Sequence, residues 1–503
     1  MMCSKAAIID LGSNSVRLVL IEINDDRSFR TINEVKEMVR LSENMAEDGI
    51  LKPNAISRTI KAIKLFKSLC EASHVEDILA VATAAVRNAV NRKEFLKLLE
   101  TEAGIHFRVI SGEEEAELGV LAVQCTMEIN SAFIVDVGGA STEITQVIGG
   151  KIKNRVSIPF GAVNLTEMFI NNRNSANGTE LLEDFLRDRF KSISWLRSDG
   201  TIPLIGLGGT IRNMCKIDRV KKGYSLDITH NYEMNDIDVL TIYRDIKDKS
   251  PGEIAGIPGI SKERVDIITA GSCVVHTLIT ELNIRKLFIS GNGIREGIFF
   301  RYYMNRFNIN EIKDVSKFST DNILKLYRAN RAHSRHVTRL SLKAYDQLRS
   351  MIDREGEYRR VFEKAAILHD VGINIDFYNR DKHNYYIITN CRINGLSHRD
   401  IALTAIIASG FTGDKLKYYY MKHTDLLSKE DYKAVKKLMA ILAICDKLDR
   451  SKSGAIKDIN CFTEKDSIII KTDKVRDGEL EISEARKQEA AFYKAFKKKL
   501  IVI

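Results

Sequence analysis

The chain has 503 residues, which is more than one hydrophobic core normally fills and predicts three or more domains. Hydrophobic residues make up 44% and charged residues 29%, a composition that excludes a fibrous or disordered chain. The net charge of +10 favours an anionic partner, whereas the single Trp and the lack of interleaved aromatic and basic residues argue against nucleic acid.

No run approaches 18 uninterrupted apolar residues, and we expect neither a secretory signal nor a membrane span or membrane partner. The eight cysteines stand singly, without a C-x-x-C pair, and Cys125, Cys273 and Cys445 lie inside apolar runs. Such usage is typical of free thiols in a reducing compartment. We therefore expect a cytoplasmic protein.

Strands and helices alternate over the first 300 residues, which predicts mixed sheets covered by helices. In the first part three strands come first, followed by helices expected at 54–72, 92–103 and 113–127 and strands expected at 78–82 and 106–110. The next part repeats this start. It continues with helices near 161–169 and at 180–193 and 262–282, and with strands at 203–205 and 285–289.

The character of the sequence changes after about residue 305. Apolar residues spaced by three and four predict helices at 319–352, 358–370, 397–408 and 429–449. A mixed tail follows, with a strand expected at 467–471 and a helix at 481–499. No Gly/Ser-rich linker separates the parts, so we expect the domains to pack together.

A short phrase occurs twice, 126 residues apart. Residues 8–15 are I-I-D-L-G-S-N-S and residues 134–141 are I-V-D-V-G-G-A-S, and in each copy an apolar strand stops at an aspartate before a turn of small residues. Such turns leave backbone N–H groups uncovered, and clustered N–H groups bind anions. A single copy would be an ordinary tight hairpin. Two aligned copies predict two turns that hold neighbouring phosphates across a cleft.

The residue seven positions after each aspartate differs between the copies. The first copy has Arg17, whose guanidinium suits a charge-assisted bond to phosphate. The second has Glu143, which phosphate would repel unless a metal ion lay between them. Because Mg²⁺ takes carboxylate oxygens and keeps most of its waters, Asp136 and Glu143 are predicted Mg²⁺ ligands, with Asp10 a third through water.

Phosphoryl hydrolysis also needs a general base, here a carboxylate near the second turn. Glu113, Glu114 and Glu115 open a helix directly after a strand, where the helix dipole tolerates acids. Acids in a first helical turn are commonly only favourable capping residues, but three in a row are denser than capping requires. The residue types alone do not choose among the three.

Seven segments extend this picture, in the order D-L-G-S-N-S-V-R-L (10–18), A-T-A-A-V-R-N-A-V-N (82–91), I-S-G-E-E-E-A (110–116), D-V-G-G-A-S-T-E (136–143), P-F-G-A-V-N-L-T-E (159–167), G-L-G-G-T (206–210) and S-G-N-G-I-R-E-G (290–297). Over residues 1–300 the chain resembles the exopolyphosphatase / guanosine pentaphosphate phosphohydrolase (Ppx/GppA) family of the actin-like ATPase superfamily. The part that follows resembles the HD-type helical domain of longer members.

The resemblance implies an α/β fold with duplicated actin-like (ribonuclease H-like) domains around a central cleft, then a mostly α-helical HD-type domain and a small α/β tail. We expect the first actin-like subdomain at 1–125, the second at 126–305, and the HD-type domain with its tail at 306–503. A homodimer is expected.

The family pattern S-G-x-E-E-A assigns the catalytic glutamate to Glu114. Ala140 replaces the third glycine of the family's G-G-G-S turn, and because alanine resists positive φ we expect a slightly reshaped second turn. The G-L-G-G-T segment corresponds to a nucleotide-contacting turn of related kinases. With an arginine that matches a phosphate-binding residue of the family, the predicted phosphate-binding residues are Gly12, Ser13, Asn14, Ser15, Arg17, Arg87, Gly138, Gly139, Ala140, Ser141, Gly208 and Gly209.

A second set of residues is spaced as in HD-type metal phosphohydrolases. The resemblance implies that Mn²⁺ or Fe²⁺ is bound there by His333, His369, Asp370 and Asp446, with His383 helping to hold a second ion. The lysine that usually follows the His-Asp motif is absent, and residues 402–409 carry no histidine where two-metal versions have one. The alternative is an inherited helical domain whose site has decayed, and an independent hydrolase activity is not expected.

The expected function is Mg²⁺-dependent hydrolysis of the terminal phosphate of linear inorganic polyphosphate, with release of orthophosphate. Guanosine pentaphosphate ends in the same phosphoanhydride group and is the alternative substrate, with the tetraphosphate as a further ligand. A long polyanion benefits more from the net charge of +10, which favours polyphosphate. A sensor that binds these compounds without turnover is a different class of function, against which the acidic residues Glu114, Asp136 and Glu143 argue.

Overall fold

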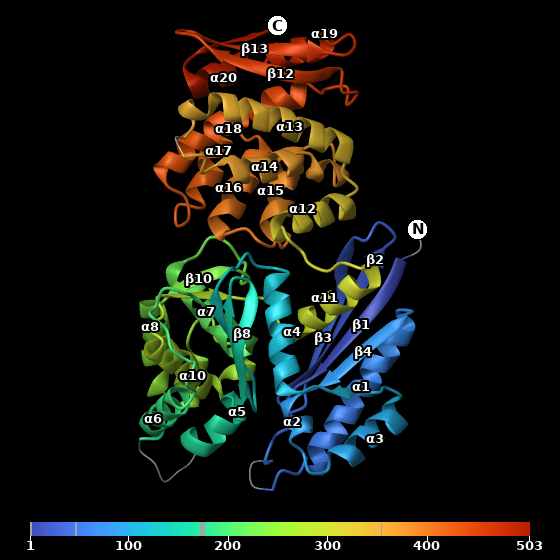
Figure 1. Cartoon of the computed structure of the whole chain (residues 1–503), viewed down its shortest axis with the longest axis vertical. Helices are drawn as coiled ribbons and strands as arrows, with labels where there is room; N and C mark the ends of the chain where they lie inside the picture. Colours follow the sequence, from blue (N-terminus) through green and yellow to red (C-terminus); the bar gives the residue numbers. More distant parts are fainter. Residues whose placement is uncertain (1–2, 46–47, 172–176, 354) are drawn as a thin grey trace. The chain divides into compact units, whose positions relative to one another are not determined.

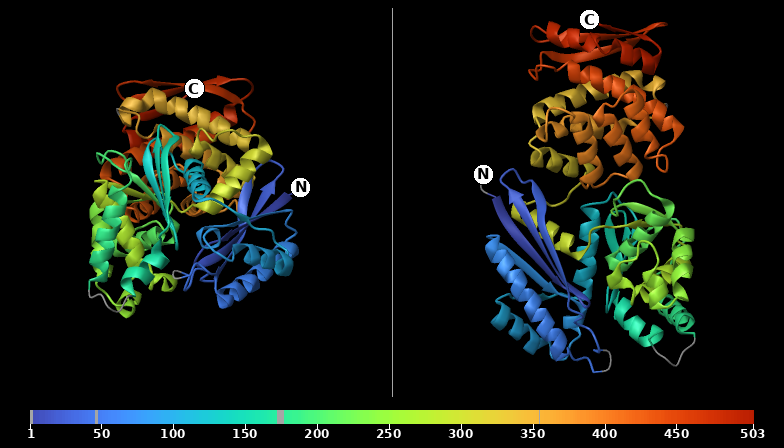
Figure 2. Two further views of the ribbon diagram at one scale, coloured as in Figure 1. Left: turned by 60° about the horizontal axis from the view of Figure 1, so that its bottom comes forward. Right: turned by 180° about the vertical axis from the view of Figure 1, so that it is seen from behind.

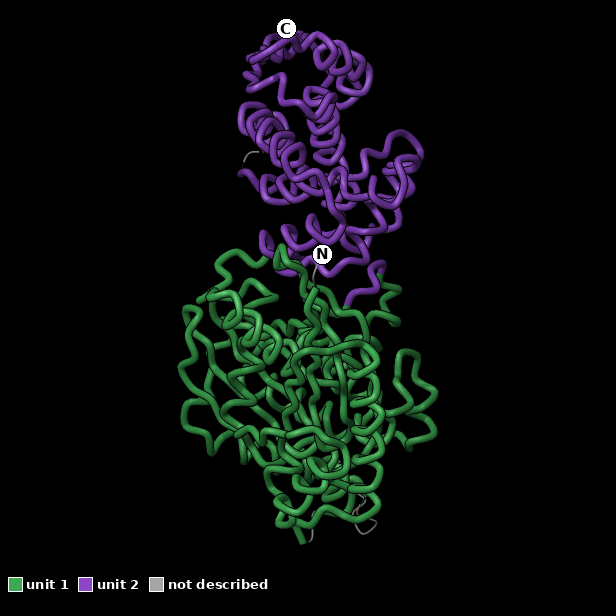
Figure 3. The backbone as a smooth tube through the Cα atoms, turned by 90° about the vertical axis from the view of Figure 1, so that its right-hand side faces the viewer, with its two compact units in different colours: residues 1–224, 229–315 green, residues 225–228, 316–503 purple. Residues whose placement is uncertain are grey.

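The computed structural model describes residues 3–45, 48–171, 177–353 and 355–503. The chain forms two compact units, shown in Figure 3: unit 1 consists of residues 1–224 and 229–315, and unit 2 of residues 225–228 and 316–503. The boundary falls ten residues after the expected position at 305.

Unit 1 contains two sheets with the same strand order. The first is ordered β3-β2-β1-β4-β5, and the second β8-β7-β6-β9-β11 with β10 added at its edge. In both, an antiparallel three-stranded meander is followed by parallel strands. The duplication expected from the repeated phrase is therefore present in the topology. The strands are β1 (Cys3–Leu11), β2 (Ser15–Asn24), β3 (Phe29–Met38), β4 (Asp77–Ala82), β5 (Arg108–Val109), β6 (Ala132–Val137), β7 (Thr142–Ile148), β8 (Lys151–Ile158), β9 (Leu204–Leu207), β10 (Tyr232–Asn235) and β11 (Lys286–Ile289).

Helices cover both faces of these sheets, and α4 and α11 pack together between them (Figures 1 and 2). The outer face of the first sheet carries α1, whose Ile63 and Phe66 are fully buried, and the second sheet carries α7 and α10. The helical segments of unit 1 are α1 (Pro53–Ala72), α2 (Ala84–Arg87), α3 (Arg92–Ala103), α4 (Gly112–Gln124), α5 (Ala162–Leu165), η1 (Thr166–Ile170), α6 (Gly178–Lys191), α7 (Gly208–Lys222), α8 (Asp236–Lys247), α9 (Pro251–Ala255), η2 (Lys262–Arg264), α10 (Ile268–Glu281) and α11 (Ile294–Phe307).

The helix predicted at 262–282 is wrong in one respect, because it is broken before Ile268. The first part contains a single 3-10 turn, and acidic residues in and just after this turn reach across to the other subdomain. Glu263 pairs with Lys36, and Asp266 pairs with Arg40 at 3.3 Å. These tertiary contacts replace the continuous helix that the apolar spacing alone predicts.

Unit 2 is a helical body that carries a three-stranded sheet, ordered β12-β13-β14. The helix predicted at 319–352 is two helices, because Arg328 adopts a positive φ of 47° and the Asn330 side chain accepts a bond from the His333 N–H to start a new one. The tail helix predicted at 481–499 is likewise two short helices and a strand. The elements are α12 (Val315–Leu326), α13 (Arg331–Leu348), η3 (Arg349–Met351), α14 (Arg359–Leu368), η4 (Val371–Asn374), α15 (Arg380–Asn390), α16 (His398–Ser409), α17 (Gly413–Met421), α18 (Lys429–Lys447), β12 (Ile456–Thr463), β13 (Ser467–Lys474), α19 (Glu479–Arg486), α20 (Glu489–Phe496) and β14 (Lys499–Val502).

Among the helices formed by the described residues, none has both the length and the apolar composition that crossing a bilayer requires.

The close approach of α4 and α11 depends on Gly297. A Cβ at this position would lie 2.1 Å from the carbonyl oxygen of Leu118 on α4. We predict that Gly297→Ala lowers the free energy of unfolding by about 1–3 kcal/mol, the usual cost of overpacking. Gly252→Ala is the matched control, because a Cβ there meets no atom within 4 Å. Urea denaturation checks the prediction, and equal midpoints for the two variants would contradict it.

Candidate active site and metal cluster

The two copies of the repeated phrase form equivalent hairpin turns. The Gly12 N–H donates to the Ser15 carbonyl at 3.1 Å, and the Gly138 N–H donates to the Ser141 carbonyl at 3.0 Å. The turns meet, because a Cβ placed on Gly139 would lie 3.0 Å from the Ser13 Cβ. The structure thus brings the two predicted phosphate-binding turns face to face.

The strand pairing fixes what stands beside each turn. Asp10 of β1 lies opposite Arg17 of β2, and Asp136 of β6 lies opposite Glu143 of β7. Arg17 and Glu143, the cation and the carboxylate that differ between the two copies, therefore stand at equivalent positions of the two sheets.

A cavity of about 130 Å³ lies between the turns. Its lining comes from both sheets and from the starts of α7 and α11. The lining residues are Asp10, Gly12, Ser13, Asn14, Ser15, Arg17, Thr83, Ala84, Glu115, Asp136, Val137, Gly138, Gly139, Ser141, Gly208, Gly209, Arg212, Arg264, Gly293, Ile294, Arg295 and Glu296. Of the predicted phosphate-binding residues, Arg87 and Ala140 are not in this lining.

Glycine is required at one position of the lining more than at the others. Gly208 has a φ of 89°, and a Cβ there would lie 2.5 Å from Oδ1 of Asp136. This glycine lets α7 begin directly against the carboxylate. Ala140, in contrast, does not adopt a positive φ, so the expected reshaping of the second turn is not needed.

Four charged side chains of the cavity receive no direct partner from the described residues. Asp10 and Asp136 have neither a hydrogen bond nor an ion pair there, and the same holds for Arg17 and Arg264. Burial raises the pKa of Asp136 to about 6, against the lowering effect of Arg212, and burial likewise raises the pKa of Asp10. Desolvated charges without partners are costly, so these groups favour a charged ligand with both anionic and cationic parts.

The basic side of the cavity is built by arginines from four segments: β2, α7, η2 and α11. Arg212 donates to the Gly291 carbonyl at 3.1 Å, and Arg295 pairs with Glu34 at 2.6 Å. Burial, together with the charges of Arg17 and Arg295, lowers the pKa of Arg212 to about 10. The guanidinium of Arg264 packs over Gly209, where a side chain would collide with it. Such a cluster of cations suits phosphate oxygens.

The glutamates that open α4 point in different directions. Glu114 receives two bonds from Arg108 of β5, at 2.6 and 2.8 Å, and one from Arg301 of α11 at 2.6 Å. The hydrogen bond from Arg108 holds the pKa of Glu114 below its ordinary value. Among the described residues Glu115 lines the cavity and Glu114 does not. The structure therefore places Glu115, in contrast to the predicted Glu114, at the candidate reacting centre.

Glu115 has the surroundings of a functional carboxylate. Burial raises its pKa well above the ordinary value, and the nearby charge of Glu143 acts in the same direction. Arg87 opposes this with an ion pair of 3.0 Å, while also donating to the Ile110 carbonyl at 2.9 Å. Arg87 was predicted to bind phosphate directly. It pairs with Glu115, which lines the cavity, and does not line the cavity itself.

Glu143 lies behind the cavity wall. Its side chain is buried and accepts a hydrogen bond of 2.7 Å from the Ser157 hydroxyl. Burial and the adjacent charge of Asp136 raise its pKa to about 7. Of the three predicted Mg²⁺ ligands, Asp10 and Asp136 line the cavity. Glu143 lies outside the lining, on β7 opposite Asp136.

Sequence reasoning missed the arginines at 212, 264 and 295. Two of them lie in or near motifs named above. Arg212 comes two residues after G-L-G-G-T, and Arg295 lies inside S-G-N-G-I-R-E-G. A basic residue directly after a glycine-rich turn was the available signal. Arg264 had none, because its position depends on the break before α10.

In unit 2, three of the four predicted metal ligands converge. One ligand atom each from His333, His369 and Asp446 lies within 4.8 Å of the others, and all three residues are buried. Nδ1 of His333 is 2.7 Å from Asp449, and Nδ1 of His369 is 2.7 Å from the Ala366 carbonyl. Both rings therefore turn Nε2 toward the cluster, and Nε2 of His333 is buried without a hydrogen bond. Two imidazole nitrogens and a carboxylate oxygen fit a transition metal, and the contacts of the two Nδ1 atoms would hold the rings in place around it.

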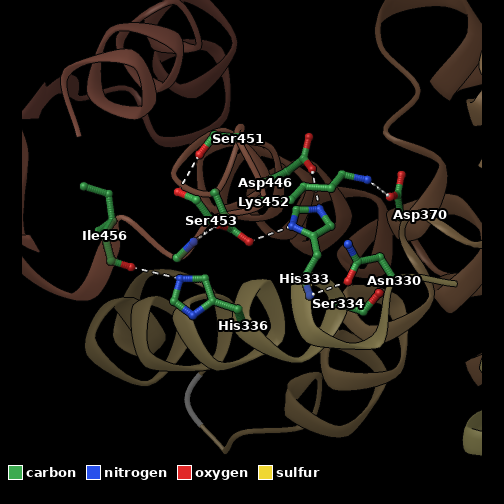
Figure 4. Close-up of polar contacts among 12 residues, drawn as sticks. Asn330, His333, Ser334, His336, Asp370, Asp446, Ser451, Lys452, Ser453 and Ile456 are labelled. Atoms are coloured by element: carbon green, nitrogen blue, oxygen red, sulfur yellow. Dashed lines mark hydrogen bonds and ion pairs between the residues drawn. The ribbon is translucent and has the colours of Figure 1, made fainter. Parts of the chain in front are cut away.

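The fourth predicted ligand, Asp370, is engaged differently. Its carboxylate binds Arg380 at 2.6 Å and Lys452 at 2.7 Å, and Figure 4 shows Lys452 reaching it beside His333 and Asp446. Among the described residues the metal-competent group does not include Asp370 or His383. Two cations from the chain itself hold Asp370 where the resemblance placed a metal ion.

A sequence profile described as the Ppx/GppA phosphatase family matches residues 20–305. A second, described as domain III of the Ppx/GppA phosphatase, matches residues 315–483. The chain belongs to the Ppx/GppA phosphatase family. It is accordingly a hydrolase, and the match to domain III begins at the boundary between the two units.

Solved structures agree with this assignment. A Ppx/GppA family member from Aquifex aeolicus is 27% identical, with a TM-score of 0.52, over 62% of this chain and 100% of that one. An exopolyphosphatase from Cytophaga hutchinsonii is 21% identical, with a TM-score of 0.55, over 60% of this chain and 98% of that one. The second likeness shows the fold alone.

The raised pKa values of Asp136 and Glu143 predict a pH-dependent stability. A carboxyl whose pKa rises on folding binds its proton more tightly in the folded state, so its contribution is greatest below the unfolded value and is lost as the pH rises through the folded one. For this pair the window runs from about pH 4 to the folded values of about 6 and 7. In EDTA, the Tm of the protein should therefore fall between pH 5 and pH 8 more than the Tm of Asp136→Asn.

Calorimetry at several pH values with EDTA and with Mg²⁺ measures this effect. A bound cation favours the ionised carboxylates, so Mg²⁺ should flatten the pH dependence of the natural protein. The same slope in both proteins, with or without Mg²⁺, would contradict the prediction.

Proposed function

We propose that this protein is an exopolyphosphatase that hydrolyses the terminal phosphate of linear inorganic polyphosphate with Mg²⁺ and releases orthophosphate. The observation that carries the proposal is the cavity where arginines and unpartnered carboxylates meet at two facing turns. Family membership supports hydrolysis, and the opposite charges of the cavity suit a phosphate together with a cation.

The proposed reaction gives each cavity group a role. Glu115 accepts a proton from the attacking water, a bond forms between that oxygen and the terminal phosphorus, and the bridging P–O bond breaks. The shortened chain leaves as an anion and the detached group leaves as orthophosphate. Arg17 and Arg212 neutralise the phosphate oxygens as charge develops. Arg87, paired with Glu115 at 3.0 Å, opposes the effect of burial and favours the ionised form of this carboxylate.

The carboxylates provide the case for Mg²⁺. Asp10 and Asp136 offer oxygen atoms that no described residue engages, and oxygen donors are those that Mg²⁺ prefers. Both fit the ion, and Glu143 adds negative charge behind them. When bound, Mg²⁺ would supply charge neutralisation for the phosphate oxygens.

The size of the cavity supports a terminal phosphate group as the part of the substrate that it holds. Its volume of about 130 Å³ is below the roughly 300–1,000 Å³ of sites that enclose a whole small molecule. It suits one end of a phosphate chain rather than a nucleoside. Guanosine pentaphosphate remains the alternative substrate, because its terminal phosphoanhydride fits the same groups.

For unit 2 we propose an HD-type domain whose ion, Mn²⁺ or Fe²⁺, is held by His333, His369 and Asp446. The support is the convergence of three buried ligand atoms with outer-shell bonds on both imidazoles. Although burial opposes it, the adjacent imidazoles of His333 and His369 hold the pKa of Asp446 well below its ordinary value, so the carboxylate is suited to a cation.

Replacing single glutamates separates the candidate bases. Glu115→Gln should lower kcat by roughly 10²–10⁴-fold, because it removes the proton acceptor. Glu114→Gln should keep kcat within about tenfold, because that carboxylate binds Arg108 and Arg301 outside the cavity. Steady-state phosphate release measures both variants. The reverse order would restore Glu114 as the base.

Substrate choice is tested by measuring phosphate release from long-chain polyphosphate and from guanosine pentaphosphate side by side with Mg²⁺. We expect the larger kcat/KM for polyphosphate. A larger value for the pentaphosphate would select the alternative substrate. Tight binding of both without release of phosphate would show a sensor.

Elemental analysis of the purified full chain should find about one Mn or Fe ion per chain. The ion should be lost from the double variant His369→Ala/Asp446→Asn and kept in Asp370→Asn, because Asp370 is held by Arg380 and Lys452. Loss from both variants would show that Asp370 is a ligand. Absence of the ion from the natural protein would show that the site has decayed.

A further inference from the structure

Unit 2 contains a second cavity, between α12, α13 and α14. Its volume is about 720 Å³, which falls among the roughly 300–1,000 Å³ of small-molecule sites. It is lined by Lys317, Thr320, Asp321, Arg335, Thr338, Arg339, Leu342, Lys343, Asp346, Gln347, Arg359, Glu363, Lys364 and Ile367. The lining shares no residue with the His333 metal cluster or with the cavity of unit 1.

Basic side chains predominate in this lining, with six Lys or Arg against three Asp or Glu. Several of the six are already engaged. Arg339 and Lys343 both bind Asp458, at 3.2 and 2.6 Å, and Arg359 binds Asp346 at 2.8 Å. The charge considered for a ligand therefore comes from Arg335 and Lys364.

Lys364 is the most informative of these. Its side chain is only 4% exposed, and its nearest carboxylate is that of Glu363 at 3.7 Å, too long for a hydrogen bond. A lysine buried to this degree normally has a close partner, because desolvating an ammonium is costly, and its ion pair with Glu363 is a long one. Arg335, on the facing helix α13, is exposed and has no ion pair or hydrogen bond from any described residue. Two cations thus line one cavity from two helices.

The rest of the wall is apolar in part. Leu342 of α13 and Ile367 of α14 line the same cavity as the two cations. A bare inorganic anion leaves such a surface uncovered, whereas an anion that carries an organic group covers it.

We infer that this cavity binds a small phosphate monoester. The phosphate dianion lies between Lys364 and Arg335, and the organic group lies against Leu342 and Ile367. A phosphate offers enough acceptor oxygens for charge-assisted bonds to both cations at once. The site is separate from the proposed hydrolytic site, and its ligand is not the polyphosphate chain, which has no apolar surface.

Calorimetric titration of the full-length protein with phenyl phosphate tests the site. Any binding of the probe in unit 1 is common to all variants, so the comparison isolates unit 2. Lys364→Met, which keeps the length of the side chain, and Arg335→Ala should each weaken one binding event at least about tenfold. Arg331→Ala is the matched control, because this exposed arginine also belongs to α13 but does not line the cavity.

The organic part is tested by titrating inorganic phosphate, which should bind this site more weakly than phenyl phosphate. If Lys364→Met does not fold, Arg335→Ala and its control decide the outcome alone. Equal affinity for phenyl phosphate in the natural protein, Arg335→Ala and Arg331→Ala would overturn the proposal, as would equal affinity for phenyl phosphate and inorganic phosphate.

Discussion

The structure of unit 1 depends on one constraint: charged side chains are withdrawn from water at the ends of two equivalent strand pairs. Asp10 and Arg17 face each other across β1 and β2, and Asp136 and Glu143 do so across β6 and β7. Burying such groups is unfavourable unless the surroundings compensate them. Two sheets of the same topology, with their turns in contact, bring Asp10, Arg17 and Asp136 into a single cavity where a ligand can provide the compensation.

The same constraint explains why the surrounding polar residues are arranged in layers. Arg87 holds Glu115 toward the cavity, and Ser157 holds Glu143 behind it. Glu114, one residue from Glu115, is turned away by Arg108. Each acid at the start of α4 therefore has its own partner, and the helix presents only one of them to the cavity.

Much of this could be predicted from the sequence, because a repeated strand–turn–strand phrase specifies local structure. The two turns and the exchange of Arg17 for Glu143 followed from residue order. Which of the three glutamates faces the cavity depends on how α4 is rotated about its axis. The sequence offered one indication, because Glu115 precedes the buried Leu118 and Gly119 by three and four residues and so lies on the same face of the helix. Arg264 was out of reach, because only contacts between the subdomains break the helix there. The same limit applied to Asp370, whose two cations come from distant segments.

The ion pairs that break the helix have a further consequence for how the cavity opens. Lys36–Glu263 and Arg40–Asp266 connect the two subdomains, and most of these side chains are substantially exposed to solvent. Exposed pairs contribute only about 0–1 kcal/mol each and are weakened by salt. Separating the subdomains at this edge therefore has a low energetic cost, while the sheets that position the charged groups stay intact. This edge of the cavity is therefore held by weaker contacts than the two hydrophobic cores on either side of it.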